Sequence, residues 1–137
     1  MIEYVVSACL AGCKCRYDGE ATASEQVQQL VREGRALPVC PEQLGGFPTP
    51  RIPFELLNGR AVSKDGQDIT DQMNRGVEEA YKLVELAGCT KAILQARSPS
   101  CGKGVIYDGS FSGTKISGNG LFAAKLLEMG LDVTSHD

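Results

Sequence analysis

Short apolar runs alternate with amphipathic segments along this chain, and no other feature restricts its fold as strongly. Four of these runs are typical of short buried strands: Tyr4–Val6, Leu37–Val39, Ala92–Leu94 and Leu131–Val133. Strands that are separated by helices pair in parallel, because the helix carries the chain back to the start of the next strand. The alternation therefore predicts β-α-β units around a mostly parallel sheet.

Three helices are expected between the strands, over residues 24–34, 70–88 and 119–130. In each of them apolar residues recur at the spacing of one helical face. Each begins at a residue suited to capping, such as Ser24, and ends at a glycine, which readily adopts the conformation that closes a helix. The segment between residues 45 and 66 contains three prolines, so we expect no regular helix there.

We therefore predict an α/β fold in a single domain that spans residues 1–137, a length that suits one domain. The domain is expected to have a mostly parallel, Rossmann-like sheet with flanking helices. Residues 60–64 are expected to form a short edge strand. A small hairpin, formed by Val105–Tyr107 and a second arm near Phe111, is expected as an insertion.

The chain has six cysteines but a single histidine, His136, in the next-to-last position. Catalytic triads, two-histidine zinc sites and facial-triad iron sites need histidine in a packed site, so cysteine and carboxylate side chains must carry any chemistry. A chain of this length builds a core without disulfides, and we expect free thiols in a cytoplasmic protein. The longest apolar stretches are too short to span a membrane, and a net charge of −3 argues against nucleic acid as a partner.

Three cysteines follow predicted strands directly or within a few residues: Cys9, Cys40 and Cys101. Because the carboxyl ends of parallel strands meet at one edge of a sheet, these thiols are expected to share a site. Cys89 precedes a strand instead, at the opposite edge, and is expected to be a buried apolar residue. Thiolates without histidine suit zinc or an iron–sulfur cluster.

Cys13 and Cys15 have no role that their spacing defines. The chain contains no Cys-x-x-Cys pair of the kind that structural zinc sites use. Cys9, Cys13 and Cys15 are one residue short of the radical-SAM spacing, and the chain is too short for that family's barrel. Cys13 and Cys15 are therefore either accessory ligands, a redox pair or neither.

Several motifs, taken together, resemble the DUF523 family. They follow in the family's order over almost the whole chain: Ser7–Gly12 (SACLAG), Cys15–Gly19 (CRYDG), Pro38–Gly46 (PVCPEQLGG), Pro48–Arg51 (PTPR), Arg97–Gly102 (RSPSCG), Tyr107–Gly113 (YDGSFSG) and Gly118–Gly120 (GNG). The best understood members of this family are similar to thiouracil desulfidases. A cysteine at position 13 departs from the family pattern.

The resemblance implies a [4Fe-4S] cluster on Cys9, Cys40 and Cys101, with one iron open to substrate. It also implies a thiolated pyrimidine, a base or a nucleotide, as the small-molecule substrate. Sulfur coordination by the open iron would make the thiocarbonyl carbon electrophilic, and water would replace the sulfur without net redox change. A non-catalytic cluster or sulfur carrier, and a thiol redox sensor using Cys13 and Cys15, are the alternatives.

Water attack needs a base, and Glu42 is the carboxylate best placed for it, two residues after Cys40. The alternative is that Glu42 stabilises the start of a helical segment at Pro41. Ser98 is a second catalytic candidate, for substrate binding or proton relay, although a serine beside Pro99 also suits an ordinary turn.

Substrate binding is assigned to a serine and three arginines that lie within these motifs. Ser100 is expected to contact the substrate or donate to cluster sulfur. The arginines would bind a pyrimidine carbonyl or a phosphate; they are Arg16, Arg51 and Arg97. For Arg16 an ion pair with Asp18 is an alternative.

Overall fold

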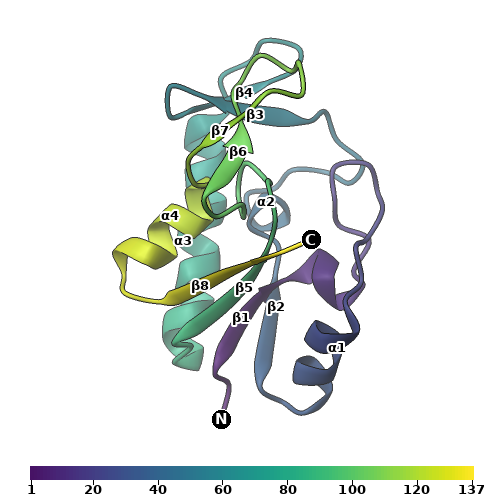
Figure 1. Ribbon diagram of the computed structural model, residues 1–137, viewed down its shortest axis with the longest axis vertical. Coiled ribbons are helices and arrows are strands. Elements are labelled where there is room, and N and C mark those ends of the chain that lie inside the picture. Colours follow the sequence, from purple (N-terminus) through teal and green to yellow (C-terminus); the bar gives the residue numbers. More distant parts are fainter.

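The main sheet has four strands, all parallel. The computed structural model describes all residues, 1–137. The sheet contains β1 (Tyr4–Ser7), β2 (Ala36–Val39), β5 (Lys91–Gln95) and β8 (Asp132–His136), in the order β2-β1-β5-β8 (Figure 1). The predicted fold class is confirmed, and each of the four strands overlaps one of the apolar runs.

Helices cover both faces of this sheet. On one face lie the one-turn helix η1 (Ala8–Ala11) and α1 (Glu25–Arg32), and on the other lie α3 (Thr70–Ala87) and α4 (Leu121–Glu128). Neighbouring strand residues point to opposite faces, which is why β1 contributes to both cores. None of the helices is long and apolar enough to cross a membrane.

Some predicted helix ends agree with local chemistry, but α3 and α4 begin after Ile69 and Gly120 and have no side-chain cap. The Ser24 hydroxyl accepts the backbone N–H of Val27 at 3.4 Å and so caps α1. Gly88 ends α3 with a φ of 75°, which a glycine adopts without the strain that a side chain would cause. These two signals are local in the chain, and they were therefore readable from the sequence.

Two hairpins and one short helix lie beyond the carboxyl edge of the sheet, around the upper part of Figure 1. The first hairpin is β3 (Phe54–Leu57) with β4 (Arg60–Ser63), and the second is β6 (Val105–Tyr107) with β7 (Lys115–Ser117). The short helix α2 (Pro41–Leu44) follows β2 directly and packs against α3.

The close approach of α2 to α3 depends on Gly76. A Cβ at that position would lie 2.0 Å from the Pro41 carbonyl oxygen, so the backbones could not keep this separation with any other residue. Because α2 follows Cys40, this contact also fixes the end of β2, where a predicted site cysteine lies.

The predicted hairpin insertion is confirmed, but the prediction of its second arm near Phe111 was wrong. Phe111 is not in the second arm of the hairpin, which is formed by β7. It lies in the turn with a φ of 57°, and its N–H donates to the Glu55 carboxylate at 3.1 Å. The short edge strand expected at residues 60–64 is confirmed as β4, which pairs with β3 in a two-stranded sheet separate from the main one.

Replacing Phe122 by alanine is expected to lower the free energy of unfolding by about 3–5 kcal/mol. Phe122 is the largest fully buried side chain and lies on α4, at the face that packs against α3 and the sheet. Chemical denaturation followed by circular dichroism measures the change. A loss below about 1 kcal/mol would contradict the assignment of Phe122 to the centre of the core.

Candidate metal centre

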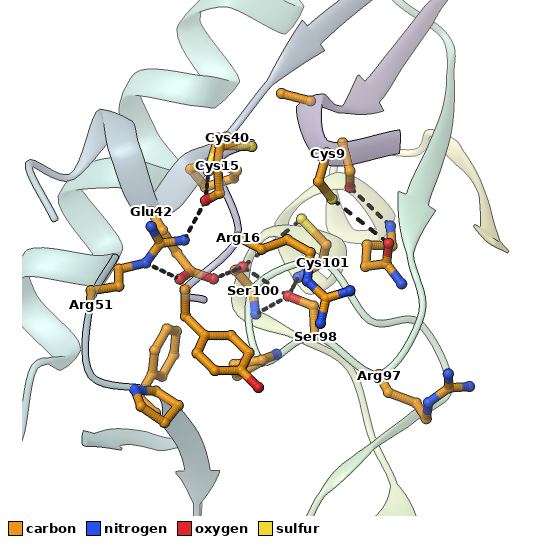
Figure 2. Close-up of a pocket in the computed structure, with 18 of the residues that line it drawn as sticks. Cys9, Cys15, Arg16, Cys40, Glu42, Arg51, Arg97, Ser98, Ser100 and Cys101 are labelled. Atoms are coloured by element: carbon orange, nitrogen blue, oxygen red, sulfur yellow. Dashed lines mark hydrogen bonds and ion pairs between the residues drawn. The ribbon is translucent and has the colours of Figure 1, made fainter. Parts of the chain in front are cut away.

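The three strand-end cysteines line one cavity of about 290 Å³ at the carboxyl edge of the sheet. Cys9 lies on η1, directly after β1, and Cys40 lies between β2 and α2. Cys101 lies in the loop that follows β5. Figure 2 shows all three side chains around this cavity. The parallel topology is what brings together residues that are far apart in the chain.

A tight turn before Cys101 holds that cysteine in place. The Ser98 hydroxyl accepts the backbone N–H of Ser100 at 3.2 Å and of Cys101 at 3.0 Å. The N–H of Gly102 donates to the Ser98 carbonyl at 2.7 Å, and a Cβ at Gly102 would lie 2.8 Å from that same oxygen. Ser98 therefore has the turn-forming role that its position beside a proline suggested.

A fourth thiol, that of Cys15, lies in the same cavity. Cys15 is only 2% exposed, and the Cys40 thiol donates to the Cys15 carbonyl oxygen at 3.9 Å. The contact with Cys15 lowers the pKa of Cys9 and of Cys40 to about 7 each, and it raises the pKa of Cys15 itself. Two of the expected ligands are thus poised to lose their protons near neutral pH, which metal binding requires.

The remaining cysteines have different surroundings. Burial raises the pKa of Cys101 to about 12, so this thiol is ionised only when a cation binds it. Cys89 is buried in the core with α3 and α4 and does not line the cavity. Cys13 is exposed, and all six cysteines are free thiols.

The donor set fits an iron–sulfur cluster better than a single ion. No group of three His, Cys, Asp or Glu side chains in the structure converges closely enough to hold one metal ion. A cubane distributes its thiolates over different irons, so its ligands must surround a cavity rather than meet at a point. Cys9, Cys40 and Cys101 surround the cavity in this way, and no histidine lines it.

One carboxylate lies at the cavity wall with both oxygens held. Arg51 donates from Nε to Glu42 Oε1 at 2.8 Å, and the Ser100 hydroxyl donates to Oε2 at 2.7 Å. The Glu42 and Arg51 side chains are 12% and 6% exposed, so this ion pair is well shielded from water. Ser98 Oγ lies 3.0 Å from Ser100 Oγ and extends the chain of hydroxyls.

Arg51 also holds the backbone of the site. Its Nη2 donates to the Cys15 carbonyl at 2.8 Å, and its Nη1 donates to Pro48 O and Thr49 Oγ1 at 3.2 and 3.0 Å. Each of its three nitrogens already donates a hydrogen bond. We infer that Arg51 positions Glu42 and Cys15, whereas the sequence had suggested a substrate contact.

The other two arginines differ in where they lie. Arg97 also lines the cavity, but its guanidinium turns away from the cysteines in Figure 2, and its Nη1 is 2.7 Å from Asp137 Oδ1. Arg16 lines the cavity, and its charge contributes to lowering the pKa of Cys9. Its Nε lies 3.8 Å from Asp18 Oδ1, a loose and partly exposed ion pair. Arg16 is therefore the cation better placed to meet a ligand.

The cavity also contains side chains that sequence reasoning did not select. The aromatic rings that line it belong to Tyr17, Phe54 and Tyr107, and Gln95 lies at the end of β5 beside Cys9. Flat aromatic walls suit a planar heterocycle. Two of these rings fall inside the Tyr-Asp-Gly motifs, which is the only signal in the sequence that would have pointed to them.

Comparison with known proteins identifies the family. The sequence model of the 2-thiouracil desulfurase family matches residues 4–137, almost the entire chain. The chain belongs to this family. The chain is similar to a protein of known structure, the [4Fe-4S]-dependent thiouracil desulfidase TudS. The two chains are 42% identical and superpose with a TM-score of 0.93, over 100% of this chain and 92% of TudS. The resemblance identified from the motifs is confirmed.

A further relative is the uncharacterized protein YbbK of Bacillus subtilis (strain 168). It is 41% identical to this 2-thiouracil desulfurase family member over 143 residues, which cover 97% of this chain and 95% of YbbK. Both relatives match over nearly their full length, so the similarity extends to the whole domain and includes the hairpins around the cavity.

Proposed function

We propose that this protein is a [4Fe-4S]-dependent desulfidase that converts a thiolated pyrimidine, such as 2-thiouracil, to the oxo-pyrimidine and sulfide. The observation that carries the proposal is the cavity in which three strand-end thiols face a held carboxylate. The family match and the similarity to TudS support the cluster and the substrate class.

Cys9, Cys40 and Cys101 would hold the cluster, which leaves one iron without a protein ligand. When bound, the cluster supplies a thiophilic Lewis acid for the sulfur of the substrate. Cys15 lies among these thiols but is not needed for a three-ligand cluster. An oxygen-sensitive cluster and six free thiols suit a reducing compartment, and we propose that the protein acts in the cytoplasm.

Glu42 is the base in this proposal. Its Oε2 accepts the Ser100 hydroxyl, and the carboxylate lies on the wall of the cavity that holds the thiols. It would take the proton from the water that attacks the carbon of the thiocarbonyl group. Arg51 keeps the carboxylate oriented, so that little reorganisation is needed during the reaction.

The two serines extend this proton path. Ser98 and Ser100 form a chain of hydroxyls that ends at Glu42, and each hydroxyl both donates and accepts. The chain would return a proton to the ring nitrogen of the product. Arg16 would bind a substrate oxygen or phosphate, and the aromatic side chains would pack against the ring.

Anaerobic assay of the cluster-loaded protein tests this function. We expect uracil and stoichiometric sulfide from 2-thiouracil, measured by chromatography and a sulfide assay, and no change in cluster oxidation state during turnover. A panel of thiolated bases, nucleosides and nucleotides then defines the substrate. Cluster-loaded protein that releases sulfide from no member of the panel would contradict the enzyme assignment and favour a carrier.

A further inference from the structure

Gln95 occupies a position in the cavity that the mechanism above does not use. It is the last residue of β5, and its side-chain carbonyl oxygen, Oε1, accepts the Cys9 thiol at 3.7 Å. The same oxygen accepts the hydroxyl of Thr22. No hydrogen bond of the protein uses the Nε2 group of Gln95, although each amide nitrogen carries two donors.

The backbone of Gln95 is fixed, so that only its side chain is free to rearrange. Its N–H donates to the Ser7 hydroxyl at 2.9 Å, and its pairing with His136 continues the sheet. Ser7 is 2% exposed and lines the same cavity as Cys101. The side-chain amide therefore extends from a strand end whose backbone is held by Ser7 and by the pairing with β8.

The hydrogen bond between Cys9 and Gln95 is incompatible with iron ligation. A cysteine that ligates iron has no thiol proton, so its sulfur becomes an acceptor only. Two acceptors, the Cys9 sulfur and Gln95 Oε1, would then face each other at hydrogen-bond distance without a proton between them. An amide resolves this conflict by a half-turn that exchanges Oε1 and Nε2, which are alike in size.

We propose that Gln95 is a positioning residue for the cluster: in the loaded protein its side-chain amide is turned so that Nε2 donates a hydrogen bond to the Cys9 sulfur. This inference rests on the cluster site proposed above and adds a residue to it. Thr22 lowers the energetic cost of rotating the amide, because its hydroxyl accepts a hydrogen bond from Nε2 as readily as it donates one to Oε1. One orientation of the amide thus accepts a hydrogen bond from the Cys9 thiol, and the other donates one to the iron-ligating Cys9 sulfur.

The hydrogen bond has a consequence that can be measured. Hydrogen bonds to the sulfurs of a cluster are one of the factors that set its reduction potential. A donor at Cys9 offsets part of the negative charge of the reduced cluster and so raises the potential. It also withdraws electron density from the Cys9 ligand, which makes the cluster a better Lewis acid.

Redox titration of the loaded protein tests the proposal. We expect the midpoint potential to be more negative in Gln95→Leu than in the unaltered protein, and more negative still in Gln95→Glu, which places an acceptor beside Cys9. Iron and sulfide content per chain should stay unchanged in Gln95→Leu. Gln67→Leu, at an exposed glutamine that does not line the cavity, is the matched control and should leave the potential unchanged.

A spectroscopic measurement reports the orientation of the amide directly. In protein labelled with 15N at glutamine side chains, pulsed electron paramagnetic resonance of the reduced cluster should detect a nitrogen coupling that disappears in Gln95→Leu. A coupling that is absent from the unaltered protein, or a potential that is the same in all variants, would overturn the inference. Failure of the unaltered protein to bind any cluster would instead overturn the proposed function.

Discussion

Replacing Cys101 by serine is expected to abolish both cluster binding and desulfidase activity while the protein stays folded. Cys101 lies in the loop after β5, whereas Cys9 lies on η1 and Cys40 follows β2. It lines the cavity and is 5% exposed. A serine hydroxyl is a far weaker ligand for iron than a thiolate. Iron and acid-labile sulfide analysis after anaerobic reconstitution should give values near zero, with loss of the broad visible absorbance.

Cys89→Ser is the matched control for this experiment. Cys89 is 7% exposed, so the two substitutions bury a hydroxyl at similar depth, but Cys89 lies in the core with α3 and α4. We expect this variant to bind the cluster normally. Cys101→Ser that kept a full cluster, or Cys89→Ser that folded normally and lost it, would contradict the assignment of ligands by strand ends.

The choice of Cys101 avoids a complication at the other ligands. Cys15 lines the same cavity as Cys9 and Cys40, and its carbonyl oxygen is 3.9 Å from the Cys40 sulfur, so its thiol is a candidate to replace a lost ligand. Cys40→Ser should therefore be compared with the double variant Cys40→Ser, Cys15→Ser. A residual cluster that disappears only in the double variant would assign this substitute role to Cys15.

Glu42→Gln is expected to reduce kcat by roughly 10²–10⁴-fold, the range typical of a lost general base. The amide is similar to the carboxylate in shape, but it is too weak a base to take a proton from water. Cluster content and visible absorbance should stay the same, because Glu42 contacts Arg51 and Ser100 and none of the three proposed ligands through a hydrogen bond. Steady-state sulfide release measures kcat.

Two further measurements make this result interpretable. Loss of one partner of a buried ion pair costs roughly 3–5 kcal/mol, so the unfolding free energy of Glu42→Gln must be measured beside its activity. Glu55→Gln is the control, because Glu55 also lines the cavity but uses Oε1 to accept the N–H groups of Gly109 and Phe111, which an amide oxygen can replace. Full activity in folded Glu42→Gln would remove Glu42 from the mechanism.

The three expected ligands illustrate how far sequence reasoning reached. Cys9, Cys40 and Cys101 were grouped because each follows a predicted strand, and parallel strands share their carboxyl edge. The structure brings all three to one cavity, and it places Cys89 in the core. Periodicity and capping are local, so the order of elements, and with it this grouping, follows from short stretches of sequence.

Cys15, Arg51 and Gln95 show where such reasoning stopped. Cys15 follows no strand, and its burial depends on the loop that Arg51 holds through a hydrogen bond to the Cys15 carbonyl. Gln95 resembles any polar residue at the end of a strand until Cys9 and Thr22 are placed beside it. The sequence by itself determined the parallel α/β fold, the family and the three strand-end thiols, since these follow from local patterns and motif order. Only the tertiary structure decided which loops, carboxylate and amide surround those thiols, because these contacts join residues from separate elements whose packing no local pattern specifies.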